Sequence, residues 1–441
     1  MTSASSQASI QFEGLTVEHS NNSRVNGVPW SKVVDKQDLV TVTMMDEGGR
    51  REVDFFGFLD DKPEQRGHSA GIPDDKTVLQ CRGLGAALED YSLFWHSHLK
   101  GHNNLGGIGF LARSKGRAPS GRPDQVVKQL FDTFINDRFL FALADGRKLN
   151  EAVSLQLKAA TDGFAQVALS AMGTTSRLYE TLLQYCDSPW NELFVEFDRQ
   201  AQSGKKKAAL VMRPTPFTFD RWQELASPGS GYRFDYDPQD LDGFERLQSP
   251  SSQVYNFFWC AGKALFGSFD QLSTVYEQTS GRAPIYLKDS IRKHGLRKLE
   301  QSTEYIQFVG KSPALTPADQ RNYNTRSLTV TDMIAYKTEL LFQWFGFPDF
   351  LQGSIPLTGR VGRSQKGGIR LGSVLHRTSD GLQSYIIGYD QSWSMEGSWT
   401  TTVHTQRGHH PQEYREWWNR ESARLPGKGK RLDVPTTGGV A

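Results

Sequence analysis

Hydrophobic and polar residues alternate most clearly over residues 383–408, which read QSYIIGYDQSWSMEGSWTTTVHTQRG. An alternation with a period of two predicts β-strands, because successive side chains of a strand point to opposite faces of the sheet. Glu396 and Gly397 interrupt the alternation, and Gly397 can take the positive φ of a tight turn. We therefore predict a long β-hairpin. One face of its first arm carries Tyr385, Ile387, Tyr389, Gln391, Trp393 and Met395.

Both faces of this hairpin also carry polar residues. The other face of the first arm holds Ile386, Gly388, Asp390 and Ser392. In the second arm, one face holds Trp399, Thr401, Val403 and Thr405, and the opposite face holds Thr400, Thr402, His404 and Gln406. An antiparallel sheet that packs on a single core has one apolar face and one polar face. The mixed faces therefore predict that one side of this sheet meets water or another subunit.

A second alternating region predicts another hairpin near the N-terminus. Its strands are expected at residues 39–44 and 52–59, and a further strand is expected at 77–81. Gly57 lies inside the second strand, which indicates a bulge or a tight bend. Residues 1–9 are small and polar, so we expect a disordered leading segment.

The period changes between these two regions. Apolar residues recur at helical spacing between residues 124 and 185, which predicts a helical insert. They are Val126, Val127, Leu130, Phe131, Phe134, Val153, Leu155, Leu157, Val167, Leu169, Leu178, Leu182 and Leu183. Strands are expected at 191–197, 209–213, 254–259, 354–358 and 368–373. A helix is predicted to begin at an N-cap at Thr331 and to end at Gly346, and a short aromatic helix is expected around Tyr414.

These patterns predict an α+β fold that is rich in β-structure, with a mixed helical and β insertion between two β regions. At 441 residues the chain exceeds the size of one hydrophobic core, so several domains are expected. We expect an N-terminal β domain at 1–98, a helical insert at 99–190, a mixed region at 191–320 and a C-terminal β domain at 321–410. Residues 411–441 are expected to form a mobile tail.

Composition narrows the possible functions. The chain holds 51 basic and 49 acidic residues, so its overall charge gives no reason to expect a nucleic-acid binder or an acidic substrate. Cys81, Cys186 and Cys260 form no CxxC pair and are odd in number, which predicts reduced and mostly buried thiols. The sequence shows no signal-peptide pattern and no membrane-spanning apolar run, so folding in a cytoplasm is expected.

Three partial motifs point to cofactor chemistry, and each is incomplete. Gly83 and Gly85 follow a strand like a dinucleotide-binding loop, but Leu88 occupies the third small position. Residues 310–312 end like a phosphate-binding loop whose first glycine is replaced by Tyr305. Residues 238–249 resemble a calcium loop with proline and serine at its first and last ligand positions. No cofactor is therefore expected.

The histidines and possible nucleophiles lack a catalytic arrangement. His96, His98 and His102 fall in a Gly/Asn-rich loop without an HExxH motif, so they are expected to be solvated, and His409 and His410 form a second pair. No cysteine has the neighbours of a nucleophile, and no GxSxG elbow is present. We therefore expect that the chain has no catalytic residue and no metal site, and that the protein is not an enzyme. The many carboxylates leave a hydrolase open as an alternative.

Short patterns occur along the chain in an order typical of one family. The N-terminal ones are Asp38-Leu39-Val40-Thr41-Val42, Phe56-Gly57-Phe58-Leu59-Asp60 and Cys81-Arg82-Gly83. The middle ones are Asn191-Glu192-Leu193-Phe194, Arg213-Pro214-Thr215-Pro216-Phe217 and residues 290–297. The C-terminal ones are Gly353-Ser354-Ile355-Pro356-Leu357, Tyr385-Ile386-Ile387, Gln391-Ser392-Trp393-Ser394, Thr400-Thr401-Thr402-Val403 and Arg407-Gly408. Together they resemble the baseplate hub proteins of contractile-tailed bacteriophages, of the late-control-D type. Residues 124–185 match no pattern of that family.

The resemblance implies a homotrimer with two β-barrel tube domains in each subunit, and part of residues 191–320 would complete the first barrel. The trimer would form a ring that joins the tail tube to the central spike and carries the DNA ejection channel. The implied partners are further copies of the chain, the tail tube protein, the central spike and baseplate wedge proteins, while DNA passes without sequence-specific binding. The implied location is the virion tail baseplate, assembled in the bacterial host cytoplasm.

The resemblance also marks a set of residues as structural. They are Gly57, Arg82, Gly83, Arg213, Pro214, Pro216, Tyr385, Trp393, Gly397, Arg407 and Gly408. Two alternative functions remain open at this point. One is a cell-wall-degrading, tail-associated hydrolase, which the aromatic and carboxylate residues of the middle region suggest. The other is the hub of a phage-like contractile injection system, which differs only in the proteins that surround it.

Overall fold

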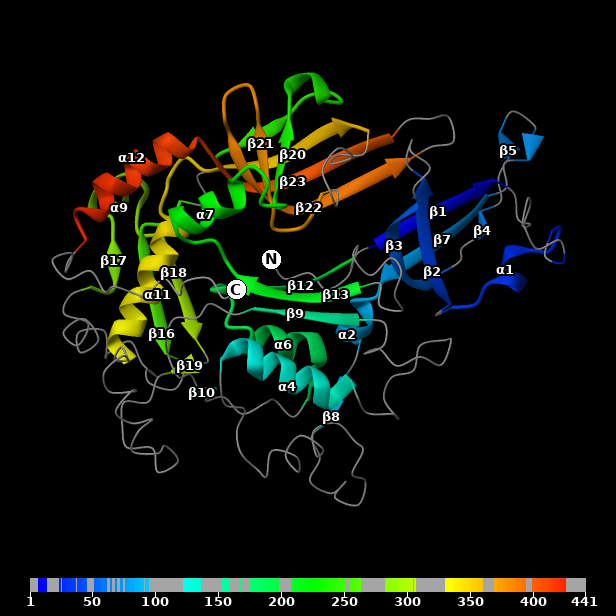
Figure 1. The fold of residues 1–441 in the computed structure, drawn as a ribbon, viewed down its shortest axis with the longest axis horizontal. Helices are drawn as coiled ribbons and strands as arrows, with labels where there is room; N and C mark the ends of the chain where they lie inside the picture. The colour runs from blue at the N-terminus through cyan, green and yellow to red at the C-terminus, as the bar shows by residue number, and fades with distance from the viewer. Residues whose placement is uncertain are drawn as a thin grey trace, which may run out of the picture.

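The computed structural model describes residues 7–13, 24, 26–36, 38–45, 51–61, 64–65, 68–69, 72–73, 76–90, 92–94, 122–135, 153–158, 167–168, 175–197, 208–250, 254–262, 282–303, 305–306, 330–359, 369–393 and 399–425 of the chain. Within these residues the fold is α+β and rich in strands, as the sequence predicts (Figure 1). The two largest sheets come from different halves of the chain, and each curls as a half-barrel.

The N-terminal sheet has the strand order β1 (Gln7–Glu13), β7 (Lys76–Gly83), β3 (Arg51–Asp61) and β2 (Leu39–Met45), and all of these pairs are antiparallel. In the sequence, the short strands β4 (Glu64–Gln65), β5 (His68–Ser69) and β6 (Ile72–Pro73) come after β3 and before β7, and α1 (Trp30–Val33) comes before β2. The predicted second hairpin, β2–β3, is confirmed. The disordered lead is wrong for residues 7–9, because they pair with β7 and Ala8 packs on the same small core as Leu79.

Gly57 lies where β3 and β7 come into close contact. It pairs with Gly83, and a Cβ atom added at Gly57 would lie 2.1 Å from the carbonyl oxygen of Arg82. That distance leaves no room for a side chain. The register shifts of this sheet fall elsewhere, after Val42 and after Leu59. Gly57 therefore marks a close backbone approach and not a bulge.

The middle sheet has the strand order β12 (Asn191–Phe197), β13 (Ala208–Pro214) and β9 (Val153–Leu157). The β12–β13 pair is antiparallel, and β9 runs parallel to β13. The helical prediction is wrong for the residues of β9, since Val153, Leu155 and Leu157 alternate with polar residues and all pack on the first core. A short run of this kind fits the helical and the strand period equally well.

The first core lies between the middle sheet and three helices, α2 (Ala86–Asp90), α4 (Pro123–Ile135) and α6 (Leu178–Tyr185). Its buried members include Phe56, Phe58, Leu88, Val126, Leu130, Phe131, Leu178, Leu182, Tyr185, Leu193, Leu210 and Met212. Residues from both sides of the expected boundaries near 98 and 190 therefore share one core. Two short strand pairs join further segments, β8 (Ser92–Phe94) with β11 (Thr175–Arg177) and β10 (Val167–Ala168) with β19 (Tyr305–Ile306). Val167, expected in a helix, thus lies in a strand.

The second large sheet has the order β14 (Arg233–Tyr236), β21 (Val374–Arg377), β22 (Gln383–Trp393), β23 (Trp399–His409), β20 (Leu351–Thr358) and β15 (Arg246–Gln248), with the 3-10 helix η3 (Pro238–Asp240) after β14. The long predicted hairpin is confirmed as β22–β23. Its turn at Glu396 and Gly397 lies outside the described residues. The strand expected at 368–373 is wrong, because Gly372 has a φ of 65° in a turn and β21 begins only at Val374.

Two register shifts change which face the hairpin residues occupy. The pairing of β22 with β23 shifts between Gln383 and Tyr385 and again between Ile386 and Gly388. Tyr385 and Ile386 are consequently both buried, but they belong to different cores. Tyr385 belongs to a second core together with Trp222 and Trp344. Ile386 belongs to a third core, whose other buried members are Phe234, Tyr236, Ile355, Leu357, Ile369, Leu375 and Val403. The predicted face that joined Tyr385 to Tyr389 is wrong, because Tyr389 packs with Ile386 in the third core. An extra residue in a bulge breaks the period of two.

The second core covers the Tyr385 side of this sheet. It is formed by α7 (Phe219–Ala226), α11 (Val330–Phe345), α12 (Pro411–Ser422) and the sheet of β17 (Ile285–Tyr286), β16 (Phe257–Gly262) and β18 (Lys298–Thr303) (Figure 1). The helix α9 (Lys288–His294) follows β17 and has no buried residue. Its aromatic members include Trp222, Phe258, Phe342, Trp344, Tyr385, Tyr414 and Trp417.

Two predictions at the ends of these helices need correction. The predicted end of α11 before Gly346 is confirmed, but the helix begins at Val330, so Thr331 lies inside it and not at its N-cap. The mobile tail is wrong for residues 411–422, because α12 is a helix whose Tyr414 and Trp417 are buried in the second core. Aromatic side chains at helical spacing gave α12 an apolar face to bury.

The three cysteines are free and buried, as predicted. Burial raises the pKa of Cys81 to about 11 and that of Cys260 to about 12, so both thiols stay protonated at neutral pH. None of the described helices is long and apolar enough to cross a membrane.

Candidate functional site

A buried polar contact joins the middle sheet to the second large sheet. The Tyr385 hydroxyl donates a hydrogen bond to Glu192 Oε2 at 2.6 Å, and Arg213 Nε donates to the same oxygen at 3.3 Å. A terminal nitrogen of Arg213 lies 3.1 Å from the Tyr385 hydroxyl. Glu192 is on β12, Arg213 on β13 and Tyr385 on β22. We call these three residues the junction, because they connect two paired strands of the middle sheet to a strand of the second large sheet.

The surroundings of the junction set its charges and its shape. Burial raises the pKa of Tyr385 well above its ordinary value, and the charge of Glu192 raises it further, so the hydroxyl keeps its proton. The Arg213 guanidinium lies 5.3 Å from the centre of the Phe194 ring and donates to the Gly372 carbonyl oxygen. A Cβ atom at Gly372 would lie 1.5 Å from Arg213, so this close contact requires glycine.

Arg407 occupies the second core next to the junction. It is a non-glycine residue with a positive φ of 57°, and its guanidinium carbon lies 3.8 Å from the centre of the Trp344 ring. Its nitrogens donate to the carbonyl oxygens of Pro216 and Gln343 and to the Tyr414 hydroxyl, at 3.3, 3.2 and 3.1 Å. Gln343 lies in the last turn of α11, so the cation also caps the negative end of that helix.

Burial lowers the pKa of both Arg407 and His409. It lowers the pKa of Arg407 to about 10, which still leaves the guanidinium charged at neutral pH. His409 is buried with Nδ1 2.9 Å from the Arg407 carbonyl oxygen and its ring 4.8 Å from that of Trp222. Burial, together with the charge of Arg407, lowers the pKa of His409 to about 3. The imidazole is therefore neutral, and its Nε2 has no hydrogen-bond partner among the described residues.

A buried ion pair links α11 to the turn that precedes β12. Lys337 Nζ contacts Asp187 Oδ2, and the Thr303 hydroxyl donates to Asp187 Oδ1 at 2.6 Å. The Lys337 and Asp187 side chains are only 1% and 3% exposed. The ammonium group also lies 4.1 Å from the centre of the Trp190 ring. Asp187 and Trp190 both lie in the turn directly before β12. The ion pair of Lys337 and Asp187 therefore fixes α11 to the strand that carries Glu192.

The expected N-terminal residues lie in a different sheet from the junction. Arg82 NH1 lies 2.8 Å from Asp90 Oδ2, and Glu89 and Asp60 lie within 4.0 Å of the same guanidinium. These contacts tie the end of β7 to α2. Gly83 pairs with Gly57 in the neighbouring strand, as described above.

The other expected residues are spread along the C-terminal half. Pro214 ends β13, and Gly408 packs so tightly that an added Cβ would lie 2.7 Å from Ser384 Oγ. Trp393 ends β22 and is 54% exposed, away from the junction. Gly397 lies outside the described residues. The structure therefore brings Arg213, Pro214, Pro216, Tyr385, Arg407 and Gly408 to one region. Gly57, Arg82 and Gly83 lie in the N-terminal sheet, and Trp393 lies at the end of β22.

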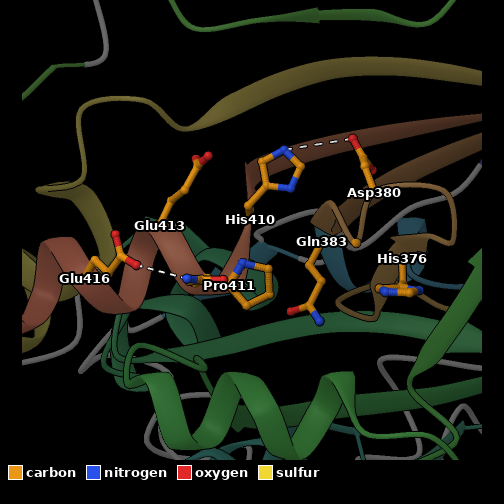
Figure 2. Close-up of a pocket in the computed structure, with 9 residues that line it drawn as sticks. His376, Asp380, Gln383, His410, Pro411, Glu413 and Glu416 are labelled. Atoms are coloured by element: carbon orange, nitrogen blue, oxygen red, sulfur yellow. Dashed lines mark hydrogen bonds and ion pairs between the residues drawn. The ribbon is translucent and has the colours of Figure 1, made fainter.

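An open surface pocket of about 620 Å³ lies between the turn that follows β21 and the first turns of α12 (Figure 2). Its titratable residues are His376, Asp380, His410, Glu413 and Glu416. Gln383 also lines it, and the Gln383 Oε1 accepts a hydrogen bond of 2.7 Å from the Trp222 indole.

The charged groups of this pocket are held by neighbouring residues. Hydrogen bonds from Arg377 lower the pKa of Asp380 to about 2, and His410 Nε2 lies 3.9 Å from the same carboxylate. His376 Nδ1 lies 2.8 Å from Asp235. A carboxylate that is ionised throughout the neutral range is a poor general acid or base. Searching the described residues finds no group of three or more histidine, cysteine or carboxylate side chains able to hold a metal ion.

No protein-family model matches the chain, and no curated protein matches it. The 43 kDa tail protein of prophage MuSo2 from Shewanella oneidensis is similar in structure, with 10% identity, a TM-score of 0.47 and coverage of 92% of this chain and 90% of that chain. The tail protein from Neisseria meningitidis MC58 has 10% identity, a TM-score of 0.41 and coverage of 83% of both chains. The E. coli c3393 protein, a component of the type VI secretion system, has 8% identity, a TM-score of 0.35 and coverage of 92% and 71%.

These structural neighbours are two tail proteins and a component of the type VI secretion system that itself exhibits structural similarity to the T4 bacteriophage tail proteins gp27 and gp5. Their likeness to this chain is distant in both sequence and geometry, so it establishes neither a family nor a function.

Sequence reasoning missed the two buried acids and the buried lysine. Glu192 alternates with apolar residues in β12, so its position favours a solvent-facing side chain, and Asp187 lies in a turn. Lys337 gave a usable signal, since it lies on the same helical stripe as Met333, Ile334 and Leu341. A charged residue on an apolar stripe predicts a buried partner.

Proposed function

We propose that this protein is the structural hub of a tail baseplate. In this role three copies form a ring that joins the tail tube to the central spike and surrounds the channel for DNA. The observation that carries the proposal is the pair of half-barrel sheets, one from each half of the chain, with the second held to the middle sheet by the buried junction of Glu192, Arg213 and Tyr385. A ring that transmits force along a tail requires sheets in a fixed mutual position, and a fully paired buried network favours one arrangement.

The half of the hairpin β22–β23 that lies nearer its turn has the properties expected of a channel wall. One side of it buries Thr401 and Val403, and the other side presents polar groups to solvent. His404 Nε2 lies 2.6 Å from Asp390 Oδ2, and Ser392 and Thr400 share a hydrogen bond of 2.8 Å. A sheet with one buried side and one wet side suits a strand pair that lines an aqueous channel.

The same surface suits the passage of DNA without binding. Neither β22 nor β23 contains a lysine, and their one arginine, Arg407, is buried. Lysine and arginine neutralise phosphates and so cause most non-specific affinity for DNA. A wall of hydroxyl groups and a paired histidine and aspartate would let DNA slide. We infer that the further partners are the tail tube protein, the central spike and baseplate wedge proteins, in a virion assembled in the host cytoplasm.

The mass and shape of the purified protein test the ring. We expect light scattering to give a trimer, alone or with its spike, and electron microscopy to show a ring. Substituting Gly397 with Val, at the predicted hairpin turn, is expected to reduce the soluble trimer, because valine disfavours a positive φ. A stable monomer that joins neither a tail tube nor a spike would overturn the proposal.

A charge reversal on the hairpin tests the channel. Asp390→Lys with Thr402→Lys places two cations on the polar side, so we expect normal trimers but slower release of DNA from assembled particles. Lys36→Glu, in the N-terminal half, is the control and should leave release unchanged. The hub of a contractile injection system has the same architecture but no DNA to pass, and particles that contain the protein but never DNA would favour that alternative.

A further inference from the structure

In addition to the pocket of Figure 2, a groove lies at the end of the molecule opposite the N-terminal sheet. It has a volume of about 810 Å³, and its lining residues come from α9 and the residues before it, from the C-terminal end of α11 and from α12. The residues that line it include Ile285 and Leu287, which precede α9, and Trp417 and Leu425, which lie in and after α12. The groove shares no residue with the pocket of Figure 2 and none with the junction.

The floor of the groove is apolar and partly aromatic. Phe342, Trp417 and Ile285 are buried members of the second core, and Tyr255, Leu287 and Leu425 are half-buried beside them. Tyr286 is 46% exposed, which is high for a large aromatic side chain. A concave apolar floor of this kind fits large apolar side chains of a partner.

The rim of the groove carries an excess of positive charge. Lys288 and Arg292 project from α9, and Arg420 and Arg424 from α12. Only two acids line the same groove, Asp289 and Glu421. Asp289 lies 3.7 Å from Arg292, and Glu421 lies within 3.3 Å of both α12 arginines.

The two acids of the groove are not equivalent. The Glu421 side chain is only 11% exposed and contacts Arg420 and Arg424, whereas the side chains of these two arginines are 62% and 63% exposed. The single charge of Glu421 offsets only one of the two arginine charges, so a net positive charge remains on solvent-facing side chains. The rim therefore attracts negative charge.

We propose that this groove binds a protein segment in which large apolar side chains are flanked by carboxylates. The apolar side chains would pack on the floor beside Tyr286 and Trp417, and the carboxylates would pair with the exposed cations of α9 and α12. This inference is independent of the proposed function, because it uses only the groove's own residues.

The charge of the rim also selects between occupants. Leu425 lines the groove, and residues 426–441 follow it in the sequence. That segment contains Lys428, Lys430 and Arg431 but only one acid, Asp433. Its positive charge has the same sign as the rim, which disfavours it as the occupant and favours an acidic partner.

Fluorescence anisotropy with the full chain tests the proposal. The probe is a labelled peptide of about 12 residues with tryptophan and leucine at helical spacing and glutamate at the other positions. The matched control is the same peptide with lysine in place of glutamate. We expect the acidic peptide to bind at least about tenfold more tightly than the basic one, and its binding to weaken as salt is added.

A charge reversal on the rim provides the second arm. In Lys288→Glu with Arg292→Glu, both exposed residues on α9, we expect at least about a tenfold loss of affinity for the acidic peptide. The control, Lys36→Glu with Lys128→Glu, carries the same change of net charge far from the groove and should bind like the unaltered chain. Because all four side chains are solvent-facing, the variants should keep the same thermal unfolding profile.

Three outcomes would overturn the proposal. Equal affinity for the two peptides would show that the rim does not select charge. Equal loss of affinity in the rim variant and the control would show that binding follows net charge and not the groove. Displacement of the bound probe by a free peptide of residues 426–441 at lower concentration than by unlabelled acidic peptide would identify the chain's own C-terminal segment as the occupant.

Discussion

Tyr385 and Glu192 are 193 positions apart in the sequence, and a hydrogen bond of 2.6 Å joins the tyrosine hydroxyl to Oε2 of the carboxylate. Arg213 donates to the same oxygen, so a buried negative charge is satisfied by a cation and by a neutral donor together. Since the three residues lie on β12, β13 and β22, their contacts decide how the middle sheet sits against the second large sheet.

Removing the Tyr385 hydroxyl tests this contact. Tyr385→Phe keeps the ring in the second core but deprives the buried carboxylate of one donor, so we expect a loss of about 2 kcal/mol of stability. Urea unfolding followed by tryptophan fluorescence measures the change. Tyr286→Phe is the control, because this ring is 46% exposed and its hydroxyl removal should change stability by less than about 0.5 kcal/mol. Equal unfolding midpoints for the two variants would contradict a structural role for the hydroxyl.

The ion pair of Lys337 and Asp187 predicts a large difference in stability between a single and a double variant. Lys337→Met leaves the Asp187 charge buried without its cation, so we expect a loss of about 3–5 kcal/mol. Lys337→Met with Asp187→Asn removes both charges and should recover most of that loss. Asparagine suits the position, because it tolerates the φ of 63° found at Asp187. A double variant no more stable than Lys337→Met alone would argue against a charge effect.

His409 predicts a pH dependence of stability. Its pKa in the folded chain is about 3, below the ordinary value of 6.5, so between these pH values the unfolded chain binds a proton that the folded chain does not. Stability is therefore complete above about pH 6.5 and falls as the pH drops through this window, by up to about 1.4 kcal/mol per pH unit.

His409→Asn should flatten this slope between pH 6.5 and about 4, because it removes the titrating group while keeping a donor near the position of Nδ1. His404→Asn, at a histidine whose side chain is 41% exposed, is the matched control. Asp380 does not interfere, since its pKa of about 2 and ordinary value of 3.8 lie below this range. Urea midpoints at several pH values measure the slope, and an unchanged slope in His409→Asn would rule out this histidine as its source.

Two glycines inside strands should respond differently to the same change. A Cβ at Gly57 would lie 2.1 Å from the Arg82 carbonyl oxygen, whereas a Cβ at Gly388 would meet nothing closer than 3.6 Å. We expect Gly57→Ala to destabilise the chain by more than about 2 kcal/mol, because the backbone must move. Gly388→Ala should be neutral or slightly stabilising, since alanine restricts the unfolded chain. Similar thermal midpoints for both variants would contradict the close approach of β3 to β7.

Local patterns predicted the elements with a long and regular period. The two hairpins and the end of α11 at Gly346 follow from alternation, from helical spacing and from turn chemistry. The same reasoning failed for Val153, Leu155 and Leu157, where a short run fits both periods. It failed again at Tyr385 and Ile386, because a register shift depends on the partner strand and leaves no mark in the alternation.

The sequence by itself determined the class of the fold, the two long hairpins, the strands β12 and β13, the helices α11 and α12 and the absence of a disulfide among the three cysteines. It also marked Arg213, Tyr385 and Arg407 as candidates, through the resemblance. Only the tertiary structure decided which polar groups are buried and what they pair with. Glu192 finds its donor 193 positions away, and Lys337 finds Asp187 150 positions away. The free energy of a buried charge depends on the atoms that replace its water, and those neighbours are set by packing in space and not by spacing along the chain.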